Sequence, residues 1–220
     1  MNISHHPSEE LLLDYTTGAL GEAWGLAVAT HLALCPACRR TVSEMEVLGG
    51  SMLDSVVPAA ISKTTLDAVM SQLGDQTETR DTSPPARPGD GSKPILPQPL
   101  RGYVGADANG LNWQRLGLGA YQLSIPTGDE RATARLLRIP AGRPVPEHSH
   151  GGLELTLVLS GAFADTTGHY GRGDLQEADQ DLKHRPLAAQ GEDCICLAVT
   201  DAPLQFSGFV ARIVQPLLGI

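Results

Sequence analysis

The chain has 220 residues and a formal net charge of −9, from 25 acidic and 16 basic side chains, and 41% of its residues are hydrophobic. This length suits two small domains or one large one, and the hydrophobic fraction supports packed cores rather than disorder. The acidic excess argues against direct binding of nucleic acid, because neutralising phosphates requires a basic surface. An acidic surface fits a basic protein partner better.

The N-terminal sequence and the hydropathy predict a cytoplasmic protein. Residues 1–5 have neither a basic start nor an apolar stretch, so no signal peptide is expected. No window approaches the roughly 20 apolar residues that a membrane span requires. With 4 cysteines the chain is no disulfide scaffold, and paired cysteines in a reducing compartment more often bind metal or sense redox state.

Helical periodicity dominates residues 1–74, for which the pattern predicts four helices. Ser8, followed by two glutamates, is typical of the N-cap of the first helix. A second helix is expected from about residue 22 to residue 34. Pro36 halts it and can open the next one, because proline is tolerated in a first helical turn.

Glycine and apolar spacing set the limits of the third and fourth helices. The third is expected to end at Gly49–Gly50, and the fourth is expected to begin near Ser62. The apolar residues of the fourth follow the i, i+3, i+4, i+7 spacing of a helix: Leu66, Val69, Met70 and Leu73.

The composition changes at residues 75–99, which hold six of the 16 prolines. Such a composition cannot bury a core, so it predicts a linker between a domain at residues 1–74 and a second one at residues 100–220. The second domain shows period-two spacing between frequent turns, which favours an all-β sandwich or barrel. Candidate strands lie at residues 120–125, 134–139, 154–159 and 193–199.

Three metal donors gather at the expected corner between the second and third helices. His31 and Cys35 are four residues apart, so a helix projects both from one face, and Cys38 follows across the turn. Tetrahedral structural zinc needs a fourth donor, which His5 or His6 can supply. Zinc there would contribute folding energy on the order of 10 kcal/mol. The alternative is a pair of buried thiols beside a surface histidine.

His6 together with the spacing His31-x-x-x-Cys35-x-x-Cys38 resembles the zinc-binding anti-sigma domain. This resemblance implies that His6 is the fourth ligand and that the partner is an extracytoplasmic-function sigma factor. The two lobes of the sigma factor would be held so that they cannot engage RNA polymerase. The fourth helix would help to form the grip, whereas the alternative role of its apolar residues is that of a core.

A second group of donors follows the spacing of the first cupin motif. Gly142, His148, His150, Glu154 and Gly161 occupy its fixed positions. The two histidines and the glutamate share parity, so a continuous strand would aim all three at one face and into a barrel. The glycines would allow the bends at the strand ends.

The second cupin motif is only partly matched. Gly173 and His184 keep the expected spacing, but three positions differ from the usual Pro, Gly and Asn of the family: Asp179, Asp181 and Ala188. His184 would join His148, His150 and Glu154 from a neighbouring strand. Such a set binds zinc or another divalent metal and leaves one or two positions open on an octahedral ion. The alternative is a metal-free barrel with polar interior residues.

Cys194 and Cys196 lie on an apolar strand, where alternation puts both sulfurs on one face. A spacing of roughly 6.5–7 Å along the strand is the upper limit for a disulfide without distortion. The favoured interpretation is a pair of small buried apolar side chains, and a redox role is the alternative.

The order of helical zinc domain, proline-rich linker and cupin domain resembles the ChrR-type anti-sigma factors over nearly the whole chain. The resemblance implies α and β structure in separate domains: an N-terminal helical zinc-binding bundle and a C-terminal cupin β-barrel of the jelly-roll type. The first domain would silence a group IV sigma factor. The second would be dispensable for inhibition but needed for the response to singlet oxygen or related oxidants.

Two other functions compete with this interpretation. One is a cupin metalloenzyme, such as a dioxygenase or an isomerase, with a zinc-bearing docking domain. The other is a transcriptional accessory protein with a different partner. The four-donor N-terminal set leaves no open coordination position, so it favours binding over chemistry. We therefore expect an anti-sigma factor that is not an enzyme, and that binds neither nucleic acid nor membrane directly.

Overall fold

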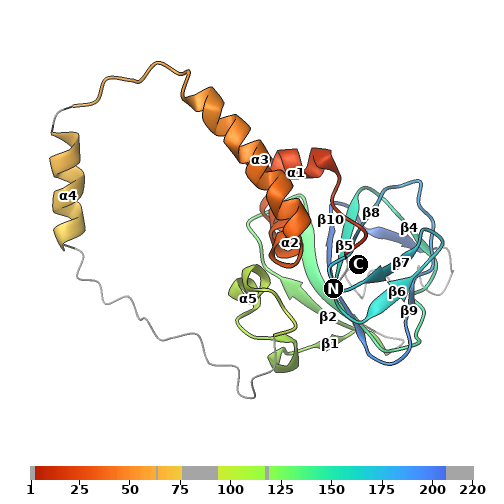
Figure 1. The fold of residues 1–220 in the computed structure, drawn as a ribbon. Helices are drawn as coiled ribbons and strands as arrows, with labels where there is room; N and C mark the ends of the chain where they lie inside the picture. Colours follow the sequence, from red (N-terminus) through yellow and green to blue (C-terminus); the bar gives the residue numbers. More distant parts are fainter. Residues whose placement is uncertain (1–2, 63, 76–93, 117–118, 207–220) are drawn as a thin grey trace. The chain divides into compact units, whose positions relative to one another are not determined.

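The computed structural model describes residues 3–62, 64–75, 94–116 and 119–206. The chain forms two compact units, one of Met1–Glu46 with Pro94–Ile220 and one of Val47–Lys93. The first unit contains a helical part followed by an antiparallel β part (Figure 1). This is the order of helices and strands that the sequence predicts.

Three helices open the chain: α1 (Glu9–Thr17), α2 (Glu22–Leu34) and α3 (Pro36–Leu53). Ser8 caps α1 as predicted, because its hydroxyl accepts a hydrogen bond from the Leu11 N–H. Gly18 ends α1 with a φ of 72°, a left-handed conformation that glycine adopts without strain. The proline at the first position of α3 confirms the predicted corner.

Helix α3 is longer than the sequence predicts. The expected end at Gly49–Gly50 is wrong, because the helix continues to Leu53 and the Asp54 N–H still donates to the Gly50 carbonyl at 3.2 Å. A glycine inside a helix costs about 1 kcal/mol relative to alanine, which is too little to end a helix by itself. The division between the two units falls within this helix, between Glu46 and Val47.

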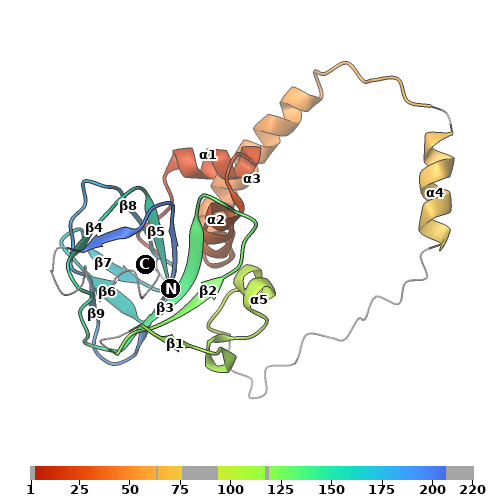
Figure 2. The same ribbon diagram turned by 180° about the vertical axis from the view of Figure 1, so that it is seen from behind.

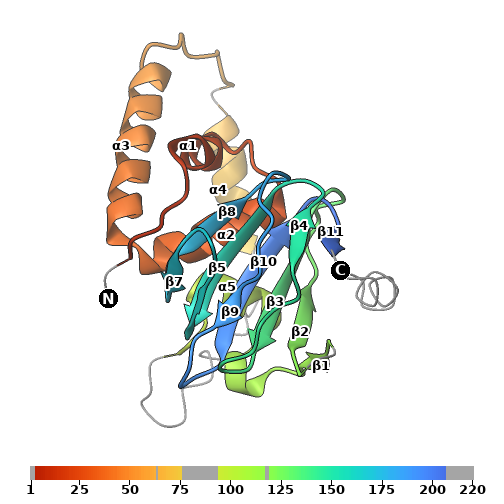
Figure 3. The ribbon, with the colours of Figure 1, turned by 90° about the vertical axis from the view of Figure 1, so that its right-hand side faces the viewer.

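The larger sheet has six antiparallel strands in the order β1-β2-β3-β10-β5-β8, which Figure 3 shows side by side. Their bounds are β1 (Gln114–Arg115), β2 (Tyr121–Ile125), β3 (Thr133–Ile139), β5 (Glu154–Ser160), β8 (Leu175–Ala178) and β10 (Cys194–Thr200). The four strands predicted from period-two spacing are β2, β3, β5 and β10, with ends within one residue of the prediction.

Two smaller sheets complete the described β part: the three-stranded β7-β6-β9 and the pair β11-β4. Their bounds are β4 (His148–His150), β6 (Ala162–Ala164), β7 (His169–Gly171), β9 (Leu187–Ala188) and β11 (Leu204–Phe206). In the described residues each sheet has two edge strands, so these strands do not close into a single barrel.

Helix α2 packs on the larger sheet and shares a core with it (Figure 2). Leu26 and Val28 of the helix are buried in the same cluster as Leu136, Leu157 and Leu197 of the sheet. Because strand side chains alternate between two faces, the neighbouring residues point the other way. A second, smaller cluster joins such residues of the larger sheet to residues of the strands β6, β7 and β9: Val158, Cys194 and Cys196 with Phe163, Tyr170 and Ala188.

A helix that the sequence did not predict, α5 (Gln98–Val104), crosses the expected boundary at residue 99. Its Leu100 is fully buried, and the helix packs against α2. Most of the predicted linker lies outside the described residues. The predicted domain limits therefore stay a prediction, although the helices up to residue 46 pack with the β part in one unit.

In the second unit, the structure describes the end of α3 and α4 (Thr65–Asp75). Helix α4 is the predicted fourth helix and begins three residues after its predicted start. Among the described residues, no helix is long and apolar enough to cross a membrane.

Candidate metal centres

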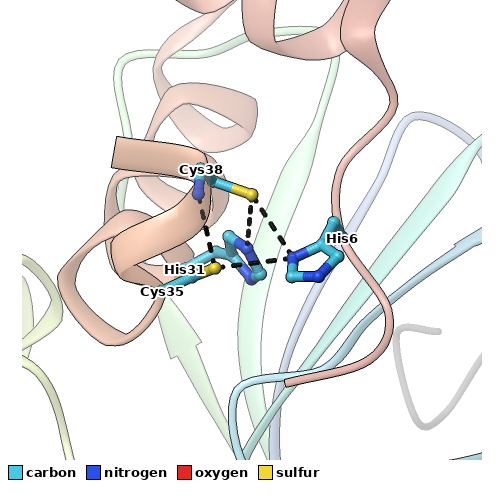
Figure 4. Close-up of side chains that lie close together, drawn as sticks. All are labelled: His6, His31, Cys35 and Cys38. Carbon is cyan, nitrogen blue, oxygen red and sulfur yellow. Dashed lines mark hydrogen bonds between the residues drawn. The ribbon is translucent and has the colours of Figure 1, made fainter. Parts of the chain in front are cut away.

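The first candidate centre joins His6, His31, Cys35 and Cys38, the four ligands expected for zinc (Figure 4). His6 lies on the segment before α1, His31 on the last turn of α2, Cys35 at the C-cap of α2 and Cys38 in the first turn of α3. The donor atoms all lie within 4.8 Å of one another. Three of the residues are buried and His6 is exposed. We call this group the helical site.

The donor distances of the helical site suit a tetrahedral ion. His31 Nε2 lies 3.3 Å from Cys38 Sγ, and His6 Nδ1 lies 3.4 Å from the sulfurs of both Cys35 and Cys38. Zinc bonds of about 2.0 Å to nitrogen and 2.3 Å to sulfur would separate neighbouring donors by roughly 3.3–3.8 Å. Two thiolates and two imidazoles are also a donor set that zinc prefers. The residues present therefore fit zinc.

Burial sets the protonation states of the helical site. It lowers the pKa of His31 to about 4, so the ring is neutral near pH 7 and its free nitrogen can bind a metal. Burial, together with the contact with Cys35, raises the pKa of Cys38 to about 12. Metal binding must therefore displace a proton from this thiol, which makes the affinity pH-dependent.

A carbonyl of the β part fixes the orientation of the His31 ring. His31 Nδ1–H donates to the Gly173 carbonyl at 2.9 Å. A carbonyl only accepts hydrogen bonds, so the proton is on Nδ1 and the Nε2 lone pair faces Cys38. Gly173 has a φ of 93°, and a Cβ there would lie 2.6 Å from Ile3 Cδ1. The sequence placed Gly173 in a cupin motif and did not predict its contact with the helical site.

The second candidate centre is formed by three buried histidines, His148, His150 and His184, which we call the cupin site. His148 and His150 lie on β4, and His184 joins them through an isolated bridge, in which the backbones of His148 and His184 exchange hydrogen bonds of 3.0 Å. His184 Nε2 lies 3.1 Å from His148 Nε2 and 3.2 Å from His150 Nε2. Three imidazole nitrogens thus converge on one point.

The strand that was expected to carry three ligands is interrupted. Gly151 and Gly152 lie in a turn between β4 and β5, and β4 pairs with β11 in a separate sheet. The prediction of a continuous strand from His148 to Glu154 is therefore wrong. The glycines allow the chain to leave one sheet and enter another. The alternation of side chains along a single strand does not predict such a turn.

Glu154, at the start of β5, lies beside the cupin site rather than among the converging nitrogens. Its Oε2 is 3.7 Å from His150 Nδ1, and its Oε1 accepts a hydrogen bond from the Thr156 hydroxyl at 3.0 Å. Burial raises the pKa of Glu154 to about 7. His150 Nδ1 is buried and has no hydrogen-bond partner among the described residues. The role of Glu154 as a ligand stays a prediction.

Two outer hydrogen bonds orient the rings of the cupin site. His184 Nδ1–H donates to Asp165 Oδ2 at 2.6 Å, and His148 Nδ1–H donates to the Pro146 carbonyl at 2.8 Å. In both rings the proton is on Nδ1, so the lone pair of Nε2 is free to bind a metal. Metal-binding histidines are usually oriented in this way. Burial also lowers the pKa of both His148 and His150 to about 4, so these rings are neutral near pH 7. The residues present therefore fit a divalent metal.

Asp165 contacts the cupin site through His184, and the sequence did not reveal this residue. It lies in the loop after β6, and its side chain is fully buried. Burial alone would raise its pKa, but hydrogen bonds from Thr167, Gln176 and His184 outweigh that effect and lower the pKa to about 2. A permanently charged carboxylate therefore holds His184. No motif spacing links Asp165 to His184, so only the folded chain shows the pair.

Cys194 and Cys196 are both buried on β10, and their sulfurs lie 3.5 Å apart. They are closer than the predicted spacing along the strand, and the pairing of β10 with β5 shifts register between Ile195 and Cys196. The contact with Cys194, together with burial, raises the pKa of Cys196 well above its usual value. A protonated thiol is a weak nucleophile, which favours the apolar role. The redox alternative stays a prediction.

The fold and the two centres define a class of protein with a helical His/Cys metal site and a cupin-like β domain. The family model of the ChrR cupin-like domain matches residues 103–203. The anti-sigma-E factor ChrR of Cereibacter sphaeroides is 49% identical over 220 residues, which is 100% of both chains. The crystal structure of Rhodobacter sphaeroides SigE in complex with the anti-sigma ChrR matches with a TM-score of 0.79 and 46% identity. It covers 91% of this chain and 100% of that chain.

The chain belongs to the ChrR family of anti-sigma factors. This membership confirms the predicted family and the predicted combination of N-terminal helices with a C-terminal cupin-like domain. It also decides between the competing functions, because the family consists of anti-sigma factors rather than cupin enzymes.

Proposed function

We propose that this chain binds an extracytoplasmic-function sigma factor in the cytoplasm and keeps it from RNA polymerase until an oxidant such as singlet oxygen triggers its release. The observation that carries the proposal is the 49% identity to anti-sigma-E factor ChrR over the whole chain. A second support is the similarity to a ChrR chain that was solved in complex with SigE. The acidic charge of −9 gives no support to direct binding of nucleic acid.

The second unit has the surface that such a partner would cover. Its apolar side chains are exposed along the end of α3, along α4 and between them: Val47, Leu48, Met52, Leu53, Val56, Val57, Ile61, Leu66, Val69, Met70 and Leu73. The four on α4 follow the spacing of one helix face. Exposed apolar surface of this extent is typical of a protein interface, because burying each such side chain is worth about 1.5–3 kcal/mol. We call these residues the apolar surface.

Zinc in the helical site would organise the helices that bind the sigma factor. Its ligands would connect the segment before α1 to the corner between the end of α2 and the first turn of α3, with a separation of 29 residues between His6 and Cys35 in the sequence. When bound, zinc supplies folding energy and fixes the N-terminal end of α3. His31 and the Gly173 carbonyl orient the site, and Cys35 and Cys38 supply the two thiolates.

The cupin site would hold zinc or another divalent metal and would take part in the response to the oxidant. Its three imidazoles lie in the interior of the β part, and Asp165 keeps one of them oriented. An open pocket of about 440 Å³ is lined by Glu147 and Arg185, which are neighbours in sequence of His148 and His184. Release would follow if oxidation of the site changed the affinity for the sigma factor.

A pull-down with the tagged full-length chain from its native cells tests the proposal. We expect an extracytoplasmic-function sigma factor to co-purify with the wild-type chain and to be lost with Cys35→Ala. Cys194→Ala is the matched control, because it removes a buried thiol outside the helical site. If no sigma factor is recovered from cells that express one, the proposed partner is wrong.

A further inference from the structure

One short segment of the β part lies between the two metal sites. It comprises the turn after β7 and the strand β8, and its N-terminal end holds the segment before α1. Asp174 Oδ1 accepts hydrogen bonds from the backbone N–H groups of Ser4 and His5 at 2.7 and 2.9 Å. The Leu175 N–H donates to the His5 carbonyl at 3.1 Å. The chain that leads directly into His6 is therefore fixed by β-domain residues.

The same turn also contacts the helical site itself. The Gly173 carbonyl accepts the Nδ1–H of His31, and Ile3 packs against Gly173. Two of the four donors, His6 and His31, therefore depend on residues 173–175 for their position. Outer hydrogen bonds of this kind usually change metal affinity by about 10–100-fold when they are removed.

The other face of β8 reaches the cupin site. Gln176 is buried, and its Nε2 donates to Asp165 Oδ2 at 2.9 Å and to the Thr167 hydroxyl at 2.8 Å. The same Asp165 oxygen accepts the Nδ1–H of His184 at 2.6 Å. Because adjacent strand residues point to opposite faces, β8 contacts the cupin site through Gln176, whereas the side chain of its neighbour Glu177 accepts a hydrogen bond from the Ser8 N–H, just before α1, at 2.6 Å.

We propose that β8 couples the two metal sites, so that a change at the cupin site alters how firmly the helical site holds its metal. The route runs from His184 through Asp165 and Gln176 to the 173–175 turn. The element with two states is the segment before α1, which is either docked on Asp174 or released from it. This proposal rests on the proposed function in that both sites hold metal, and it gives the oxidant response a physical path.

Cobalt provides the test, because thiolate-to-cobalt charge transfer gives an absorption band that reports on Cys35 and Cys38. The full-length chain is loaded with cobalt, mixed with excess chelator, and the decay of this band is timed. Asp174→Ala should speed the decay by about tenfold. Ser4→Pro removes one N–H donor from the other side of the contact and should speed the decay in the same direction.

The coupling itself is measured with a double-mutant cycle. His148→Ala perturbs the cupin site and should change the decay rate by about fivefold or more. In a Gln176→Met background, which keeps the side-chain length but removes both hydrogen bonds, the same change should disappear. Asp193→Ala is the matched control for Asp174→Ala. Asp193 also accepts a backbone N–H, that of Ala141, but it has no contact with either site among the described residues.

The outcomes are distinct. Absence of the band in the wild-type chain would reject the helical metal site and with it part of the proposed function. A normal band whose decay is unchanged by Asp174→Ala and Ser4→Pro would overturn the coupling alone. An effect of His148→Ala that persists at full size without Gln176 would also overturn it.

Discussion

The helical site and the cupin site differ in how many of their donors already converge. The helical site brings together two sulfurs and two nitrogens, a complete tetrahedral set. The cupin site brings together three nitrogens, with Glu154 at its side rather than among them. A complete set of protein donors suits a structural ion, whereas an incomplete one leaves positions for water or a small reactant. One chain thus carries two donor sets that differ in completeness, as expected if the first site holds a structural ion and the second admits another ligand.

The two sites also share a feature. Each has a histidine whose Nδ1–H is held by an acceptor distant in sequence, the Gly173 carbonyl for His31 and Asp165 for His184. A neutral carbonyl only orients the ring, whereas a carboxylate also strengthens it as a donor. The difference again favours a structural role for the first site and a tuned one for the second.

The largest effect is expected from loss of a thiolate in the helical site. Cys38→Ser should remove one bound zinc per chain and weaken sigma-factor binding by at least about 100-fold, because zinc binding there is folding energy. Metal analysis and calorimetric titration measure the two effects. Cys196→Ser, which removes a buried thiol on β10, should leave sigma binding unchanged. Equal losses in both variants would show that the effect is not specific to the helical site.

A charge on the apolar surface should weaken sigma binding without affecting either metal site. Leu53 is 72% exposed, and we expect Leu53→Asp to cost about tenfold or more in affinity, as for a residue at the centre of an interface. Metal content and thermal unfolding should stay as in the wild type. Leu187, 48% exposed on β9, provides the control Leu187→Asp. Equal affinities for both variants and the wild type would place the interface elsewhere.

Asp165→Asn should weaken metal binding at the cupin site by about tenfold, because an amide supports the His184 ring less than a carboxylate does. Competition with a chromophoric chelator measures the affinity. Asp193→Asn is the control, since Asp193 has no contact with either site among the described residues and accepts the Ala141 N–H, which an amide oxygen can still accept. An unchanged affinity in Asp165→Asn would show that this carboxylate does not tune the site.

The smallest expected effect is a pH dependence that comes from Asp174. Burial by itself would raise the pKa of this carboxyl, but the N–H groups of Gly171, His5 and Ser4 outweigh it and hold the pKa below its usual range. A lowered folded-state pKa stabilises the protein above the unfolded-state pKa of about 4, and the contribution is lost as the pH falls further. In the metal-free chain, the stability difference between wild type and Asp174→Ala should be constant at neutral pH and shrink below about pH 4. A difference that grows on acidification would contradict the assignment.

The sequence predicted three donors of the helical site because their placement depends on local geometry, whereas His6 was chosen over His5 only by the family resemblance. His31 and Cys35 share a helix face, and Pro36 fixes the corner that brings in Cys38. The alternation of apolar residues likewise located β2, β3, β5 and β10. In both cases the relevant spacing lies within about ten residues of chain.

The features that the sequence did not reveal depend on contacts between distant segments. Asp165 meets His184, and Gly173 meets His31 across a separation of 142 residues. The turn at Gly151–Gly152 separates Glu154 from the strand of His148. Helix α5 is short, and its burial against α2 is a tertiary effect. Neither periodicity nor motif spacing contains this information.

The most direct test of the central claim is run-off transcription by RNA polymerase with the cognate extracytoplasmic-function sigma factor while the purified full-length chain is titrated. We expect inhibition that is complete near one chain per sigma factor, that is lost with Cys38→Ser, and that is retained with His148→Ala. Unchanged transcription at a large excess of the zinc-loaded wild-type chain would contradict the claim that this protein is the anti-sigma factor for that sigma factor.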